Sequence, residues 1–117
     1  MKKILITGGA GFIGSNAAEY FFKRKWKIYV LDNLSRKGSK LNLQRLKKNT
    51  NIIFIKCDIR NFNNLSKTLK KVNPKAIIHA AGQVAVTTSF LNPREDFEIN
   101  ALGTFNLLEA IRINKLK

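Results

Sequence analysis

The sequence is poor in cysteine, proline and acidic residues. Its 117 residues include one cysteine, two prolines and seven acidic side chains. A single cysteine excludes an intramolecular disulfide and a zinc site built from several cysteines. No apolar stretch approaches the roughly 18 residues that a membrane-spanning helix needs, and glycines interrupt the N-terminus where a signal peptide would continue. We therefore expect a soluble, cytoplasmic chain that has no membrane partner.

Positive charge, by contrast, is abundant. Lysine and arginine number 22, which gives a formal net charge of +15. This charge has two interpretations, nucleic-acid binding or basic residues spread over solvated helix faces. The basic residues occur in groups of at most three, such as Lys23–Lys25 and Lys70–Lys71, and no run of five like charges appears. We expect no nucleic-acid partner; binding that falls steeply with salt would indicate the opposite.

Short apolar runs alternate with helical patterns along the chain. The runs are continuous rather than alternating, as is typical of strands buried on both faces, and cover Lys3–Thr7, Lys27–Leu31, Ile52–Lys56 and Ala76–Ala80. Helices are expected over Phe12–Arg24, Ser39–Lys48, Asn61–Val72 and from Pro93 to Asn114. Strand–helix alternation predicts an α/β fold, a Rossmann-type parallel sheet with helices on both faces.

Two of these helices show one-sided apolar patterns. In the third, the residues at helical spacing are Phe62, Leu65, Leu69 and Val72. In the last, the residues that share a face are Phe97, Ala101, Phe105, Leu108 and Ile111. Pro93 suits the first turn of this last helix.

The first strand is followed by glycines spaced G-x-x-G-x-x-G. Gly8 allows a tight exit from the strand, Gly11 allows a phosphate to approach the backbone, and Gly14 allows the next helix to pack closely on the sheet. The helix begins with Phe12 and Ile13, where free N–H groups and the helix dipole favour an anion. We expect a dinucleotide pyrophosphate at this turn.

An acidic residue follows at the spacing that such a site requires. Asp32 ends the second strand, 18 residues after Gly14 and so close to the spacing of about 20 that the motif has, where its carboxylate accepts hydrogen bonds from ribose hydroxyls. The same carboxylate repels a 2′-phosphate, which favours NAD. Arg36 and Lys37 lie close by in the sequence and keep NADP as the alternative.

These residues resemble the extended short-chain dehydrogenase/reductase family, the NAD-dependent epimerases and dehydratases. The turn Thr7–Gly14 carries the resemblance, and three later stretches agree with it, Asp58-Ile59-Arg60, His79-Ala80-Ala81-Gly82 and Asn100. The resemblance implies that Asp58 binds the adenine amino group beside Ile59. It also implies that Ala80, Ala81 and Gly82 line the cofactor phosphates and ribose, and that Asn100 helps to order the site.

Two segments narrow the resemblance to one branch of that family, the CDP-paratose 2-epimerases. They are Asp32–Gly38 and Ala81–Ser89. The resemblance implies that Asn33, Ser35 and Arg36 support the adenosine end of NAD. It also implies an enzyme that oxidises a nucleotide-sugar carbon, C2 in this branch, and then returns the hydride. A UDP-glucose 4-epimerase or a dTDP-glucose 4,6-dehydratase is the alternative.

The family's catalytic residues are a Tyr-x-x-x-Lys pair and a serine or threonine. The two tyrosines here, Tyr20 and Tyr29, are followed four residues on by Arg24 and Asn33. We therefore expect residues 1–117 to be the N-terminal part of an NAD(P)-binding Rossmann domain, truncated after about four strands and the long helix. Catalytic residues, later strands and a substrate domain are absent, so it stays open whether this chain alone is an enzyme.

Several expectations follow from this truncation. The chain is a truncated gene product, an incomplete sequence, a split enzyme whose partner is a separate C-terminal half or a second copy in a homo-oligomer, or a non-catalytic dinucleotide-binding module, and the sequence does not decide among these. The strand Ala76–Ala80 would form an apolar edge, so we expect the chain alone to be marginally stable or prone to aggregate.

Four other positions have ordinary structural interpretations. We expect Cys57 to be a small buried residue beside the adenine pocket, His79 to be a hydrogen-bonded core histidine and Trp26 to serve in packing. The run Thr87-Thr88-Ser89 either contacts substrate or caps a short helix, and the sequence does not decide between the two.

Overall fold

A four-stranded parallel sheet forms the centre of the molecule. The computed structural model describes residues 1–82 and 86–117. The strands have the spatial order β3-β2-β1-β4 and comprise β1 (Lys3–Thr7), β2 (Lys27–Asp32), β3 (Ile53–Lys56) and β4 (Ala76–His79). Each pair is parallel, and each crossover contains a helix, as the strand–helix alternation predicts.

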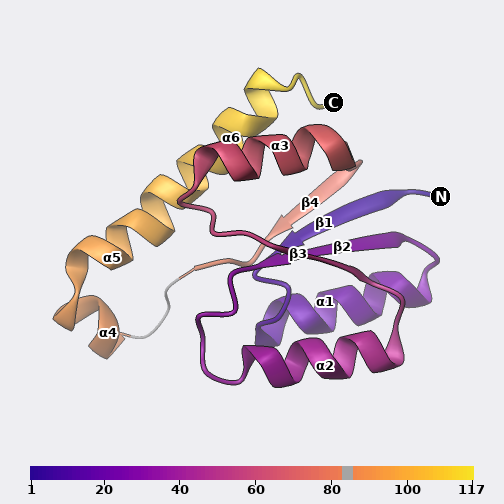
Figure 1. Cartoon of the computed structure of the whole chain (residues 1–117), viewed down its shortest axis with the longest axis horizontal. Helices are drawn as coiled ribbons and strands as arrows, with labels where there is room; N and C mark the ends of the chain where they lie inside the picture. Colours follow the sequence, from indigo (N-terminus) through magenta and orange to yellow (C-terminus); the bar gives the residue numbers. More distant parts are fainter. Residues whose placement is uncertain (83–85) are drawn as a thin grey trace.

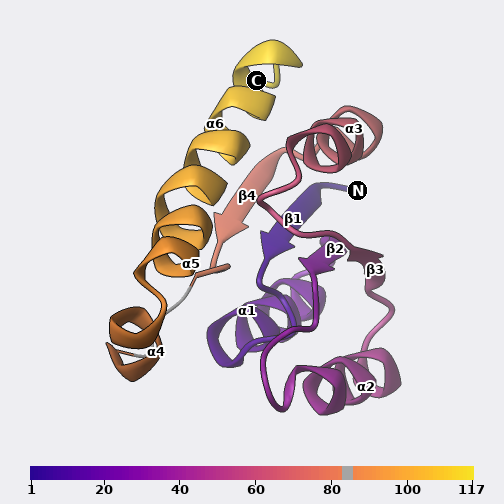
Figure 2. The same cartoon turned by 60° about the vertical axis from the view of Figure 1, so that its left-hand side comes forward.

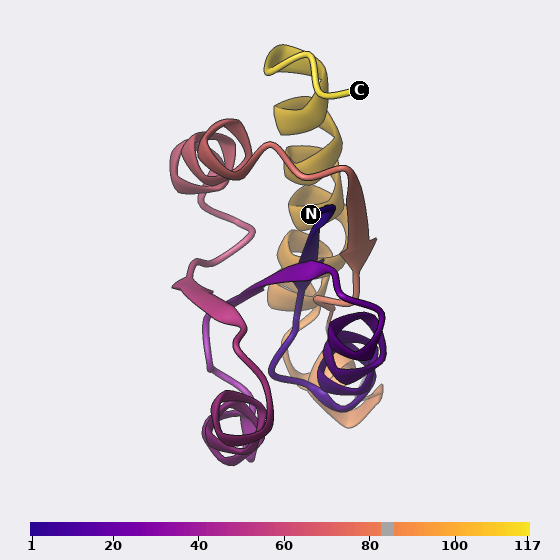
Figure 3. The same ribbon diagram turned by 90° about the vertical axis from the view of Figure 1, so that its right-hand side faces the viewer.

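Helices cover both faces of this sheet. Figures 1 and 3 show α1 (Phe12–Lys23) and α2 (Ser39–Asn49) on one face. On the other face lie α3 (Phe62–Val72) and the last helix, α6 (Gly103–Ile113). The predicted Rossmann-type fold is confirmed. The expected helix and strand bounds differ from the observed ones by at most one residue, apart from the long final helix.

The core consists of two apolar clusters, one on each face of the sheet. Successive residues of β1 point to opposite faces, so Ile4 and Ile6 pack with α1 and α2, while Leu5 packs with α3 and α6. The predicted apolar face of α3 is turned inward, with Leu65 and Leu69 fully buried. The central strands β1 and β2 are continuous apolar runs because both of their faces are covered, whereas β3 and β4, at the two sides of the sheet, are only partly buried.

The final helix differs from the expectation. In place of one regular helix, the segment from Pro93 forms α5 (Pro93–Phe97), a π-helical turn η1 (Glu98–Leu102) and α6. A short helix, α4 (Val86–Leu91), precedes α5, as Figure 2 shows. The expected face is largely in solvent, because Phe97, Phe105 and Leu108 are 64%, 60% and 62% exposed. The face that packs includes Gly103 and Leu107.

The sequence is apolar on two faces of this helix, and Gly103 decides between them. A Cβ at Gly103 would overlap the side chain of Ile59, so this glycine allows α6 to approach the β3–α3 connection closely. Asn106 supports the same contact, because its side-chain amide donates to the carbonyl of Ile59 at 2.9 Å. None of the helices in the described part of the chain is long and apolar enough to cross a membrane.

Candidate functional site

The carboxyl ends of the strands meet at one edge of the sheet, which carries two adjoining pockets. One has a volume of about 110 Å³ and the other of about 390 Å³. Because the two pockets share part of their lining, they form one continuous depression. The shared residues are Gly8, Gly11, Arg36, Ser39, Ala80 and Gly82. In open parallel sheets, ligands bind at this edge.

The structure brings nearly all the predicted site residues to this depression. The first pocket is lined by Asp32, Asn33, Ser35, Asp58, Ile59 and Ala81 in addition to the shared residues. The second is lined by Phe12, Ile13 and Gly14. Asn100 lines neither pocket, but its Oδ1 lies close to Gly82, 3.2 Å from the position that a Cβ there would occupy.

The glycine turn is shaped by close backbone contacts. Gly8 has φ +65°, its N–H donates to the Leu31 carbonyl at 2.8 Å, and a Cβ on it would lie 2.6 Å from the Ala81 nitrogen. A Cβ on Gly14 would overlap the Gly8 carbonyl oxygen. Gly11 is the N-cap of α1 and provides no side-chain cap. The start of α1 therefore faces the depression with backbone N–H groups and no capping side chain.

Asp32 joins the end of β2 to this turn. One carboxylate oxygen accepts from the Ala10 N–H at 3.0 Å, and the other accepts from the Leu34 N–H at 2.8 Å. Leu34 itself has φ +60°. These two bonds hold the carboxylate at the mouth of the pocket, between the glycine turn and the β2–α2 connection, where a ribose hydroxyl could reach it.

Asp58 lies at the centre of a compact polar cluster. One oxygen accepts from the Arg60 N–H and Nε at 2.9 and 3.0 Å, and the other accepts from Arg60 Nη2 at 2.7 Å and Asn33 Nδ2 at 3.1 Å. Arg60 lowers the pKa of Asp58 to about 2, mainly by these side-chain hydrogen bonds. With four donors the carboxylate is fully ionised at neutral pH, and its four in-plane lone pairs are engaged.

The β2–α2 connection is organised by side-chain to backbone bonds. The Ser35 N–H donates to Asn33 Oδ1 at 3.1 Å, and the Arg36 carbonyl accepts from the Ser39 hydroxyl at 2.7 Å. Asn42 donates to the Ala10 carbonyl at 3.0 Å and so ties α2 to the glycine turn. Sequence reasoning missed Ser39 and Asn42 as pocket residues, because a polar residue early in a helix has no distinctive spacing.

The residues for which the sequence predicts structural roles lie as follows. Cys57 is buried and lines the first pocket, and burial raises the pKa of its thiol. Trp26 packs edge-on against Phe21, with ring centroids 5.4 Å apart. The run Thr87-Thr88-Ser89 lies inside α4, where the Ser89 hydroxyl donates to Asp96 at 2.7 Å. Residues 83–85 of the resembling segment lie outside the described residues.

Comparison with known proteins identifies the family of this chain. The family model described as GDP-mannose 4,6 dehydratase matches residues 5–117. The chain belongs to this family. It is 51% identical over 110 residues to a CDP-paratose 2-epimerase of Salmonella typhi, a match that covers 94% of this chain and 32% of that protein.

Two solved structures of nucleotide-sugar 4-epimerases share the fold. The UDP-glucose 4-epimerase of Thermus thermophilus, in complex with NAD, is 36% identical with a TM-score of 0.86, covering 98% of this chain and 35% of that one. The UDP-Glc/GlcNAc 4-epimerase of Campylobacter jejuni is 35% identical with a TM-score of 0.90, covering 99% and 35%. The chain spans about a third of the length of these relatives.

Proposed function

We propose that residues 1–117 form the NAD-binding part of a nucleotide-sugar epimerase of the CDP-paratose 2-epimerase kind. The observation that carries this proposal is the Asp32 carboxylate, which lies at the end of β2 and is hydrogen-bonded to the glycine turn beside one continuous depression. When bound, NAD would supply an acceptor, and later a donor, of hydride at a sugar carbon. The 51% identity to a CDP-paratose 2-epimerase supports the substrate class.

The residues present fit the pyrophosphate of a dinucleotide. Gly11 begins α1 without a side-chain cap, and a Cβ on Gly14 would overlap the backbone of Gly8. The N–H groups of Phe12 and Ile13, together with the helix dipole, would hold the phosphates. Ala80 and Gly82 line the second pocket together with these residues.

The adenosine end would lie over the β2 and β3 carboxyl ends. Asp32 would accept hydrogen bonds from the ribose hydroxyls, a role that favours NAD over NADP because a 2′-phosphate would meet a carboxylate. Asp58 would accept the adenine amino group in exchange for one of its present donors, and the Asn33 amide, at 3.1 Å, is the longest of these bonds. Arg36 lines both pockets and would border the adenosine.

The cofactor part of the proposal is tested by titrating the chain with NADH and NADPH and following nicotinamide fluorescence. We expect tighter binding of NADH, and Asp32→Asn should raise its dissociation constant by roughly 10- to 100-fold, because a charged acceptor is lost. Glu109→Gln, a surface carboxylate paired with Arg112, is the matched control. Tighter binding of NADPH would overturn the choice of cofactor, and no binding of either would overturn the proposal.

The substrate part needs a second experiment. The chain is incubated with NAD and CDP-paratose, alone and with a polypeptide that carries a Tyr-x-x-x-Lys pair, and the configuration at C2 is followed by NMR. We expect conversion when the second polypeptide is present. NAD binding without conversion under either condition would instead favour a non-catalytic dinucleotide-binding module.

A further inference from the structure

A chain of hydrogen bonds connects β1, β4 and the last helix behind the glycine turn. Thr7 Oγ1 lies 2.6 Å from His79 Nδ1, and His79 Nε2 lies 3.0 Å from Thr104 Oγ1. At one end, the Thr104 hydroxyl donates to the Asn100 carbonyl at 2.6 Å. At the other end, the Ala81 N–H donates to Thr7 Oγ1 at 3.2 Å.

The order of donors and acceptors in this chain follows from its two ends. A carbonyl only accepts, so the single hydroxyl proton of Thr104 is used on Asn100, and Thr104 Oγ1 must accept from His79 Nε2–H. A neutral imidazole that donates from Nε2 accepts at Nδ1. The Thr7 hydroxyl therefore donates to Nδ1 and still accepts the Ala81 N–H.

A proton on Nδ1 would break this order. The Thr7 hydroxyl would then face two donors, His79 Nδ1–H and the Ala81 N–H, and its own proton would lose its acceptor. Thr7 is fully buried, so water cannot replace that acceptor. Burial also lowers the pKa of His79, which favours the neutral ring.

The series of hydrogen bonds ends at Ala81, where two walls of the pocket touch. The Ala80–Ala81 peptide is so close to Gly8 that a Cβ on Gly8 would lie 2.7 Å from the Ala80 carbonyl carbon. The Ala80 N–H also donates to the Thr7 carbonyl at 3.0 Å. The backbone and side chain of Thr7 together therefore hold this peptide against the glycine turn.

We propose that His79 is a positioning residue, which is held as the neutral Nε2–H tautomer and orients the Thr7 hydroxyl. The oriented hydroxyl accepts the Ala81 N–H and so fixes the wall formed by Ala81 and Gly82 against the glycine turn. The effect on a dinucleotide rests on the proposed function, whereas the tautomer and the Ala81 bond do not. The Nε2–H bond to Thr104 extends this support to the π-helical turn that contains Asn100.

The tautomer is measurable directly, because His79 is the only histidine of the chain. A long-range ¹H–¹⁵N correlation spectrum near neutral pH should show Nδ1 as the unprotonated, downfield nitrogen and Nε2 as the protonated one. The Nδ1–H tautomer, or an imidazolium, would overturn the proposal whether or not the chain binds NAD.

Variants of Thr7 test the positioning. Thr7→Val keeps the shape and removes the hydroxyl, so the amide signals of Ala81 and Gly82 should shift and exchange faster with solvent, and the NADH dissociation constant should rise about tenfold. Thr7→Ser should restore both. Thr50→Val, which removes a hydroxyl bonded to the Leu46 carbonyl, is the matched control and should change neither.

The outcomes separate this inference from the proposed function. Unchanged Ala81 and Gly82 signals in folded Thr7→Val would overturn the positioning role. Shifted signals with unchanged NADH affinity would overturn its effect on the cofactor. If the unsubstituted chain binds no NADH, the proposed function fails, and the tautomer and the Ala81 signals still decide this inference.

Discussion

Where the carboxyl ends of the strands meet (the carboxyl edge of the sheet), backbone segments touch one another. Where their amino ends meet (the amino edge), the chain turns in open space. Gly8 and Lys25 show the difference, since they have almost the same φ, +65° and +67°. A Cβ on Gly8 would lie 2.6 Å from the Ala81 nitrogen, whereas Lys25 is exposed. Gly8 is therefore required because the Ala80–Ala81 backbone approaches it closely. Its left-handed conformation alone would not require glycine, since Lys25 adopts almost the same φ.

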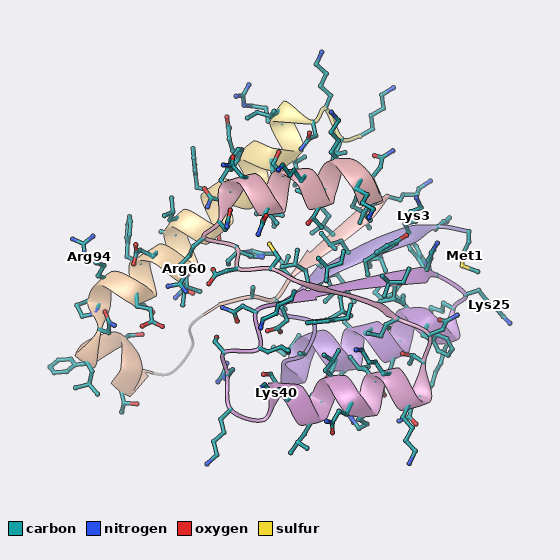
Figure 4. All side chains as sticks on the ribbon, in the orientation of Figure 1. Met1, Lys3, Lys25, Lys40, Arg60 and Arg94 are labelled. Carbon is teal, nitrogen blue, oxygen red and sulfur yellow. The ribbon has the colours of Figure 1, made fainter. Side chains whose placement is uncertain are left out.

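Charge separates the two edges in the same way. Figure 4 shows Met1, Lys3 and Lys25 at the opposite end of the sheet from Arg60. The amino edge has an open depression lined by Lys2, Lys3, Lys75, Lys115 and Lys117. The carboxyl edge holds Asp32 and Asp58, each bonded to backbone N–H groups. The fold thus gathers five of the lysines at the amino edge, whereas Arg36 and Lys37 line the second pocket of the candidate site.

The largest expected effect is at the glycine turn. Gly8→Ala places a methyl group within 2.8 Å of three backbone atoms of Ala80 and Ala81. We expect it to lower the free energy of unfolding by roughly 3–5 kcal/mol, as left-handed strain and overpacking add. Urea unfolding followed by circular dichroism measures this loss.

Gly38→Ala is the matched control for that substitution. Gly38 has φ +87°, and nothing lies within 4 Å of the position of its Cβ. It should therefore show the strain alone, about 1–2 kcal/mol. Equal losses in the two variants would contradict the view that close approach, rather than backbone conformation, makes Gly8 necessary.

A smaller loss of stability is expected when the polar cluster around Asp58, at the carboxyl edge, is disrupted. The pKa of Asp58 is lowered to about 2 from 3.8, so its ionised form stabilises the fold above pH 3.8, and this stability is lost as the pH falls through 2. Asp58→Asn should cost about 1 kcal/mol at pH 7, after allowance for solvent screening. The difference from the unsubstituted chain should shrink between pH 4 and pH 2 in urea titrations.

An exposed ion pair provides the comparison for this cluster. Glu109 and Arg112 form a similar contact on α6, but Glu109 lacks the backbone and asparagine donors that Asp58 has. Glu109→Gln should leave both the free energy of unfolding and its acid dependence unchanged within error. A loss as large as that of Asp58→Asn would show that the pairing alone, without the other donors, stabilises the fold.

The sequence predicts the elements of the site better than the contacts among them. Strand ends and glycine spacing predict the places of Gly8, Gly14 and Asp32 beside the depression, because these features depend on local periodicity and on the turn between β1 and α1. The convergence of Asn33 on Asp58 depends on a loop in which Leu34 has φ +60°, and no spacing rule gives such a conformation.

Two other features depend on contacts between segments that are distant in sequence. The sequence predicts that His79 is hydrogen-bonded, and it is, but its partner Thr7 follows from the pairing of β1 with β4, which brings together two residues 72 positions apart. The inward face of α6 depends on Gly103 meeting Ile59. Periodicity alone offers two apolar faces there and cannot choose between them.

The smallest expected effect has the opposite sign and lies at the amino edge. Helix α1 ends in a Schellman motif, in which the Lys25 N–H donates to the Phe22 carbonyl at 3.0 Å and the Trp26 N–H to the Phe21 carbonyl at 3.1 Å. Lys25→Gly should relieve left-handed strain and raise the free energy of unfolding by about 0.5 kcal/mol, after the entropy that glycine adds to the unfolded chain.

Lys25→Ala separates this strain from the loss of charge. It removes the same ammonium group but keeps a Cβ at φ +67°, so it should bring none of the gain. Equal stabilisation by alanine and glycine would mean that relief of charge repulsion at the basic edge is responsible. A gain with glycine alone would show that a Cβ at the amino edge costs only local strain, whereas at Gly8 it also disrupts the contact between two walls of the candidate site.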